Sequence, residues 1–129
     1  MDGMSSNIIH LAGRDQPASL LLVERDPLAR TAVAAHLRQA GLSVIEAVTG
    51  AEALKLLRAR RAVAVVFGAL RPDVVAQIQR EFPRVKLLLG RDKRSAISPA
   101  GLPSVRRPYD LREVEQATKA LMARPKAPS

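Results

Sequence analysis

The chain has 129 residues, 47% of them hydrophobic, and this length suits one domain with a single core. Its 21 lysines and arginines against 12 aspartates and glutamates give a formal net charge of +9, which favours an acidic partner, either a protein or a nucleic acid. The absence of cysteine excludes disulfide bonds and thiolate metal sites, and it agrees with a cytoplasmic location. An arginine- and alanine-rich composition is also typical of GC-rich genomes, so the charge has a second, compositional explanation.

The first part of the chain predicts a tail, a buried strand and a helix. Residues 1–18 are polar and unpatterned, without the features of a signal peptide, and no apolar run in the chain approaches the ~20 residues of a membrane span. The apolar run 19–23 is typical of a parallel strand that is buried on both faces. After a polar turn, Pro27 suits the start of a helix and Gly41 suits its end.

The middle of the chain predicts two further strands, each followed by a helix, and then a fourth strand. The second strand covers 44–48, and Thr49 and Glu52 are spaced as the capping box of the helix behind it. The third strand covers 63–67. A short helix over 73–82 and a fourth strand over 85–89 follow it.

The last part of the chain predicts a weak edge strand and a final helix. Residues 91–102 are polar and broken by proline and glycine, so one or two helical turns are the most that we expect there. Residues 103–106 suit an edge strand, because a proline lacks the amide donor that a central strand needs. Asp110 and Glu113 open the last helix as a cap pair. The predicted organisation is a tail (1–18), one domain (19–122) and a second tail (123–129).

Strand and helix patterns alternate five times, which predicts parallel βα units joined by right-handed crossovers. In such sheets the ligands bind at the carboxyl ends of the strands. The residues at those ends are therefore the candidates for function.

Several segments at those ends resemble the receiver domain of two-component response regulators. They are LVERDPL at 22–28, EAVTGAEAL at 46–54, the apolar strand that leads to Gly68 with Pro72 four residues later, and VRRPYDL at 105–111. The resemblance implies a flavodoxin-like α/β fold, with a doubly wound five-stranded parallel sheet in the order 2-1-3-4-5.

The resemblance also implies which residues form the phosphorylation pocket, and here most of the reactive groups are missing. The acidic pair of receivers aligns with Glu24 and Arg25, with Asp26 one residue further along. The phosphorylated aspartate aligns with Gly68, and the hydroxyl residue of the fourth strand aligns with Gly90, give or take one position. The aromatic switch residue aligns with Ser104. We therefore expect no phosphorylation, negligible Mg²⁺ binding and no cofactor.

Only the cation of the receiver pocket is kept, as Arg107 in place of lysine. Its planar guanidinium is expected to pair with Glu24 or simply to balance that charge. The other alternative is that Arg107 lies in solvent as part of a binding surface. Paired stability measurements distinguish these roles.

The expected function is that of a non-phosphorylatable pseudo-receiver that binds another signalling protein in bacteria. The resemblance implies that the interaction face corresponds to the fourth helix, fifth strand and fifth helix of receivers, and its candidate residues here are Arg91, Lys93, Arg94, Ser104, Arg106 and Tyr109. Homodimerisation through this face is left open. The alternative is a basic protein that associates with nucleic acid on the same scaffold, although only net charge supports it.

Other chemistry finds little support in the sequence. An enzyme is not expected, because there is no glycine-rich phosphate loop, no serine–histidine–aspartate set and no metal cluster. His36 falls on the inward side of the first helix and is expected to be half-buried and neutral rather than a phosphoryl carrier. The basic run 58–61 ends the second helix, where the helix dipole favours cations, and it lacks the aromatic residues that stack on bases.

Overall fold

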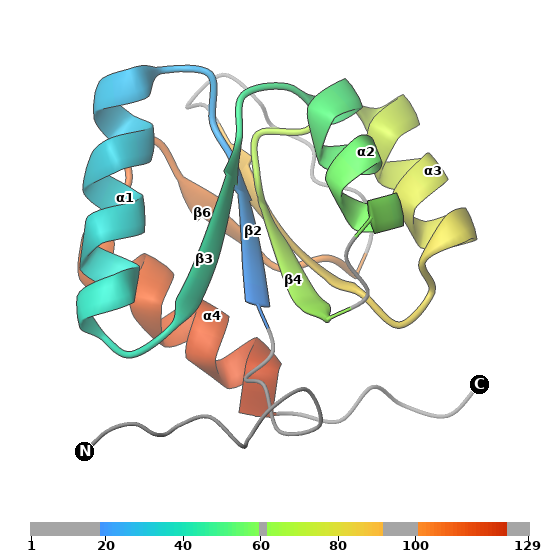
Figure 1. Ribbon diagram of the computed structural model, residues 1–129. Coiled ribbons are helices and arrows are strands. Elements are labelled where there is room, and N and C mark those ends of the chain that lie inside the picture. The colour runs from blue at the N-terminus through green and yellow to red at the C-terminus, as the bar shows by residue number, and fades with distance from the viewer. Residues whose placement is uncertain (1–18, 60–61, 92–100, 124–129) are drawn as a thin grey trace, which may run out of the picture.

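The computed structural model describes residues 19–59, 62–91 and 101–123. These residues form strands that alternate with helices (Figure 1). The elements in chain order are β2 (Ser19–Val23), α1 (Pro27–Gln39), β3 (Ser43–Ala47), α2 (Gly50–Ala59), β4 (Val63–Gly68), α3 (Pro72–Glu81), β5 (Lys86–Arg91), β6 (Ser104–Arg106) and α4 (Leu111–Ala123).

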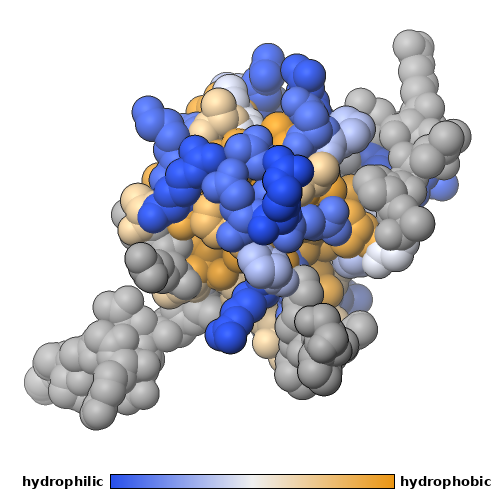
Figure 2. Space-filling model, turned by 90° about the vertical axis from the view of Figure 1, so that its right-hand side faces the viewer, coloured by the Kyte–Doolittle hydropathy of each residue, from blue (hydrophilic) through white to orange (hydrophobic). Residues whose placement is uncertain are grey.

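The strands form one five-stranded parallel sheet in the order β3-β2-β4-β5-β6. Counted along the chain this is the order 2-1-3-4-5, which confirms the fold predicted from the sequence. Helices α1 and α4 cover one face of the sheet, and α2 and α3 cover the other (Figure 1). Figure 2 views the molecule from the side of α2 and α3, where hydrophilic side chains gather over the centre of the face.

The central strands are buried on both faces because their side chains alternate between two apolar cores. Leu21 and Val66 point into the core that α2 and α3 cover, together with Ile78 of α3. Leu22 and Phe67 point into the core that α1 and α4 cover, together with Val114 of α4. The continuous apolar runs of the sequence therefore predict these strands correctly.

Short polar side chains cap the starts of α1, α2 and α4, whereas Arg71 before α3 makes no side-chain cap. The carboxylate of Asp26 accepts a hydrogen bond from the backbone N–H of Leu28 (3.1 Å), with Pro27 in the first turn of α1. Thr49 Oγ1 accepts from the N–H of Glu52 (3.1 Å), and Glu52 Oε1 accepts from the N–H of Val48 (2.6 Å). Each bond satisfies a donor that the start of a helix would otherwise leave unpaired.

Several element boundaries differ by one or two residues from the predicted ones. β4 includes Gly68 and β5 continues to Arg91, because both strands keep their pairing to neighbours beyond the apolar runs. β6 begins at Ser104 and not at Pro103, since proline has no N–H to donate. α4 continues to Ala123, one residue past the predicted end of the domain.

Part of the predicted structure lies outside the described residues. The tail 1–18 and most of the segment 91–102 belong to this part, as do 124–129 of the C-terminal tail. Within the described ranges, no helix combines the length and the apolar character that crossing a membrane requires.

Candidate functional site

A pocket of about 440 Å³ opens at the carboxyl edge of the sheet, where the sequence predicts the site. The turn after β2, the β3–α2 junction and the β4–α3 loop form its walls, and Arg107 reaches it from the segment between β6 and α4. The lining residues are Val23, Glu24, Arg25, Asp26, Val48, Thr49, Gly50, Ala69, Leu70, Arg71, Val74 and Arg107. The fold therefore brings four of the six predicted pocket residues to one cavity.

Glu24 is the buried charge of this site, with only 3% of its surface exposed. Its Oε2 accepts hydrogen bonds from the N–H of Asp26 (2.8 Å) and from Nη2 of Arg107 (3.1 Å). Its backbone carbonyl accepts from Nη1 of Arg30 (2.8 Å). The other carboxylate oxygen, Oε1, is buried and accepts no hydrogen bond from any described residue. Of the two carboxylate oxygens of Glu24, only Oε2 therefore accepts hydrogen bonds from the described residues.

Arg107 pairs with Glu24 across the strand ends, which is the contact that the sequence suggested. The Arg107 side chain is 30% exposed, whereas the Glu24 side chain is 2% exposed, so solvent reaches the pair from the Arg107 side. The Arg107 Cζ atom also lies 5.6 Å from the centroid of the Tyr109 ring, a distance at which a cation and an aromatic face attract each other.

Gly68 lies at the end of β4 with no room for a side chain. A Cβ atom built on it would lie 2.9 Å from Cβ and 3.1 Å from the backbone carbon of Val23, and it would collide with the Val23 carbonyl oxygen. These atoms belong to the paired strand β2, so they cannot move aside as a flexible side chain can. The position that the resemblance aligns with the phosphorylated aspartate of receivers therefore has no space for a side chain.

Gly90 is also covered, in this case by the phenol of Tyr109. A Cβ atom at Gly90 would meet the Tyr109 hydroxyl and would lie 2.9 Å from Cζ and 3.0 Å from Cε1. The Tyr109 ring packs on Phe67 with centroids 4.9 Å apart and the planes at 60°. Tyr109 therefore occupies the space into which a side chain at position 90 would extend. The sequence pattern gives no signal for this contact, because it joins residues on different elements.

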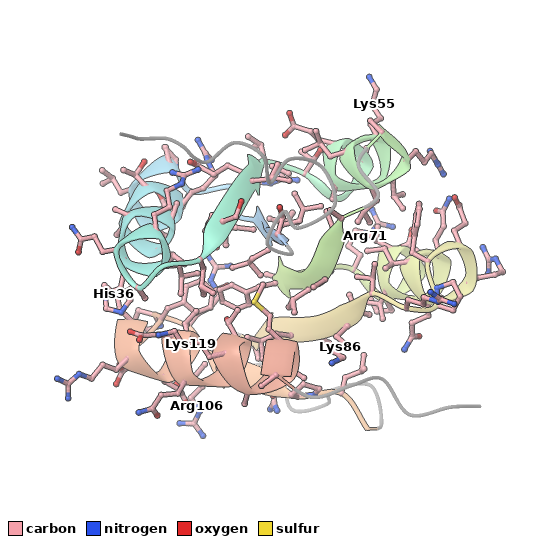
Figure 3. The ribbon with its side chains drawn as sticks, turned by 60° about the horizontal axis from the view of Figure 1, so that its bottom comes forward. His36, Lys55, Arg71, Lys86, Arg106 and Lys119 are labelled. Carbon is pink, nitrogen blue, oxygen red and sulfur yellow. The ribbon has the colours of Figure 1, made fainter. Side chains whose placement is uncertain are left out.

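Tyr109, one of the residues of the expected interaction face, lies partly in the core. Its hydroxyl is buried and its ring belongs to the core beneath α1 and α4. Of the other expected members, Arg91 donates to Ser104 Oγ (3.3 Å), so both are half-buried beside each other on β5 and β6. Arg106 is exposed at the edge strand (Figure 3). Lys93 and Arg94 lie outside the described residues.

The residues at this edge do not fit the magnesium ion that receiver pockets bind. Gly68 offers no carboxylate, Arg107 occupies one oxygen of Glu24, and the carboxylate of Asp26 caps α1. Arg25 and Arg71 line the pocket and would repel a divalent cation. No group of three or more acidic or histidine side chains in the described ranges could hold a metal ion.

Two other polar residues that the sequence singled out have structural partners. His36 Nε2 of α1 lies 2.8 Å from Oε1 of Glu115 on α4, and Glu115 also pairs with Lys119 at 3.0 Å (Figure 3). Lys119 and His36 lower the pKa of Glu115. His36 is half-buried, as expected, and it ties α1 to α4.

Arg58 holds the end of α2 to α3. Its guanidinium donates to both carboxylate oxygens of Glu81, at 3.2 and 3.0 Å. This contact raises the pKa of Arg58 and lowers that of Glu81, which also accepts from Gln77. Arg58 therefore has a carboxylate partner in addition to the helix dipole. The neighbouring arginines at 60 and 61 lie outside the described residues.

The fold is that of solved receiver domains. A putative response regulator from Chloroflexus aurantiacus is similar with a TM-score of 0.72 and 22% identity, over 84% of this chain and 100% of that chain. The signal receiver domain of an HD domain-containing protein from Pseudomonas fluorescens gives 0.72 and 19%, over 89% and 93% of the two chains. A CheY-like receiver domain protein from Methanospirillum hungatei gives 0.71 and 20%, over 82% and 94%.

No protein-family model matches the sequence, and no curated protein matches it. At identities near 20% the similarity to solved structures establishes the receiver fold, and the chemistry of the site has to be argued from this chain's own residues.

Proposed function

We propose that the chain is a pseudo-receiver, a module that binds another signalling protein in a bacterial signal-transduction pathway without being phosphorylated. It acts in the cytoplasm and catalyses no reaction. The observation that carries the proposal is Gly68, which has neither the carboxylate that a phosphoryl group would need nor the space for one.

The rest of the pocket supports the same function. Arg107 neutralises the one buried carboxylate, and the Tyr109 phenol fills the place of the hydroxyl side chain that would hold a phosphoryl oxygen. These contacts hold the residues of the pocket in one conformation, whereas the corresponding residues of a phosphorylated receiver move or react. A module of this kind signals through binding, and the receiver neighbours named above are themselves parts of signalling proteins.

The chemical half of the proposal is tested by incubating the purified protein with acetyl phosphate and Mg²⁺. We expect no acyl phosphate by intact mass spectrometry, because no carboxylate stands at position 68. A labile phosphoryl adduct on Glu24 or Asp26 would refute the proposal.

The binding half is tested by affinity capture of partners from lysate of the native host at low and high salt. A signalling protein retained at high salt is the expected result, since an interface with an apolar component resists screening. Retention of nucleic acid alone, lost steeply as salt rises, would replace the proposal with the nucleic-acid alternative. Size-exclusion chromatography of the same sample distinguishes self-association.

A further inference from the structure

β3 is an edge strand of the sheet, so half of its backbone polar groups point away from β2. The N–H of Glu24 donates to the carbonyl of Ala47 (3.0 Å), so the backbone groups of Ala47 face β2. Successive residues of a strand direct these groups to opposite sides. The N–H and C=O groups of Val44 and Glu46 therefore point outward, to the side on which no described strand pairs with β3. These outward groups form the β3 edge.

An arginine of α1 covers one of the outward groups. Arg38 lies in the last turn of this helix, which packs against β3 (Figure 1). Its Nη2 donates to the carbonyl oxygen of Val44 (2.8 Å), and its Nη1 donates to Oε2 of Glu46 (3.0 Å). The guanidinium fork therefore binds a backbone group and a side chain of the same strand.

Glu46 positions this arginine. Its side chain lies on the face of the sheet that α1 covers, because alternate side chains of a strand share a face and Val44 belongs to the core beneath α1. Its Oε1 lies 3.4 Å from Nε of Arg30 on the same helix. The side chains of Arg38 and Glu46 are 49% and 33% exposed, so this ion pair contributes little to stability by itself. Its effect is to hold Arg38 at the Val44 carbonyl.

The helix dipole accounts for the charge of Arg38 but not for its direction. A cation in the last turn of a helix is favoured whether or not it bonds to a neighbouring strand. Arg80 in the last turn of α3 serves the dipole in this way, with its side chain exposed. The two bonds from Arg38 to β3 therefore call for an explanation at the β3 edge.

Without its cover, the β3 edge is complementary to the same edge of a second copy. Two antiparallel β3 strands related by a two-fold axis at Ile45 would place Val44 opposite Glu46 of the second copy. Residues opposite each other in this way exchange two hydrogen bonds, so the pairing would use the outward groups of both copies. In each copy Arg38 already occupies the Val44 carbonyl, and the pairing has to break that bond first.

We infer that Arg38 closes the β3 edge of the sheet against pairing with a second copy of this chain. Unpaired edge strands promote the association of folded proteins, and a charged side chain at the edge is one of the means by which proteins prevent it. The inference goes beyond the proposed function, because it concerns self-association and holds whichever partner the molecule binds elsewhere.

The test compares the self-association of the wild-type protein with that of Arg38→Ala and Arg38→Ser by sedimentation equilibrium. The short side chains of these variants cannot reach Val44, and circular dichroism checks that both are folded. We expect both to dimerise about tenfold more tightly than the wild type, because pairing no longer breaks a hydrogen bond to the Val44 carbonyl. Arg80→Ala removes the same charge from the other face of the sheet and should associate as the wild type does (Figure 1).

Amide hydrogen exchange locates the contact. In the Arg38 variants the amides of Val44 and Glu46 should exchange more slowly as the protein concentration rises, whereas in the wild type their exchange should not depend on concentration. Protection centred on another surface would overturn the inference, as would the same protection in the wild type. Equal association of Arg80→Ala, or no dimer of either Arg38 variant at millimolar concentration, would overturn it too.

Discussion

The two halves of the carboxyl edge use the space above the strands in opposite ways. Over β4 and β5 the edge is closed, because the sheet packs against Gly68 and the Tyr109 phenol covers Gly90. Over β2 and β3 it stays open as the 440 Å³ pocket, with exposed valine and arginine side chains at its rim. The carboxyl edge is therefore packed over β4 and β5 and open over β2 and β3.

The Glu24–Arg107 pair lies at the boundary between the two halves. Its guanidinium reaches from the segment that also carries Tyr109, and its carboxylate belongs to the turn after β2. The pair therefore connects the closed half to the wall of the open half. Substitutions on either side of this boundary test whether the closed half is as tightly packed as its geometry indicates.

The largest effect is expected from Gly68→Asp. The new Cβ would collide with the backbone of β2, and overpacking of this kind costs about 1–3 kcal/mol, here near the upper end because backbone has to move. The aspartate is still expected to remain unphosphorylated, since Arg25 repels the metal and Gly90 has no hydroxyl. Urea denaturation and intact mass spectrometry after acetyl phosphate treatment measure the two outcomes.

Ala69→Asp is the matched control, because the same charge enters one residue later at an exposed position. It should change stability by less than about 0.5 kcal/mol. An equally small loss of stability in Gly68→Asp, or phosphorylation of its new aspartate, would contradict the prediction. Either result would mean that the sheet near Gly68 adapts to a side chain more easily than its contacts imply.

Arg107→Ala is expected to have the next largest effect. Removing the guanidinium leaves the carboxylate of Glu24 buried with one bonded oxygen, which should cost about 1–3 kcal/mol, the penalty of an unpaired buried polar group. Glu24→Gln removes the charge and should offset part of that loss in the double variant. Thermal melts of the two single variants and the double variant give the coupling energy. Strictly additive effects would show that the pair does not hold the two halves together.

Gly90→Ala tests the closed half at a position that is covered by a side chain, whereas Gly68 is covered by backbone. The added methyl group meets the tip of the Tyr109 side chain, which can rotate, so we expect a cost of about 1 kcal/mol and a displaced phenol. The chain has one tyrosine and no tryptophan, so its intrinsic fluorescence reports on Tyr109 alone. In a Tyr109→Ala background the cost of Gly90→Ala should largely disappear. An unchanged cost would mean that the phenol does not cover Gly90.

The fold was predictable because its signals are local in the sequence. Apolar runs such as 19–23 identify buried strands, and caps such as Asp110 identify helix starts, since each depends on residues only a few positions apart. The ion pair of Glu24 with Arg107 could also be suggested, because the resemblance brings those two positions to one edge.

The groups that pack over Gly68 and Gly90 could not be predicted from local sequence signals. That Tyr109 turns over Gly90 depends on how a loop from β6 meets the end of β5, and no spacing in the sequence records that distance. The steric closure at Gly68 likewise depends on the approach of Val23 on another strand. The sequence shows which residues stand at the strand ends, whereas only the three-dimensional packing shows which side chains lie over them.

The smallest effect is expected from acidification, which compares the helical layers on the two faces of the sheet. Glu115 joins α4 to His36 of α1 on one face, and Glu81 joins α3 to Arg58 of α2 on the other. Lys119 and His36 lower the pKa of Glu115, and Arg58 and Gln77 lower that of Glu81. A lowered carboxyl pKa means that the stabilisation is present above the unfolded-state value and is lost as pH falls through the folded-state value.

Both contributions should therefore fade as the pH falls below about 4. Because solvent reaches both carboxylates in part, we expect Glu115→Gln and Glu81→Gln each to reduce the acid-induced fall in melting temperature by no more than about 2 °C. The two variants differ in a second readout, since α4 follows directly on the segment that carries Tyr109. Loss of the Glu115 contacts should alter Tyr109 fluorescence at neutral pH, and loss of the Glu81 contacts should not. Equal fluorescence changes in both variants would mean that the packing of Tyr109 does not depend on the contacts between α1 and α4.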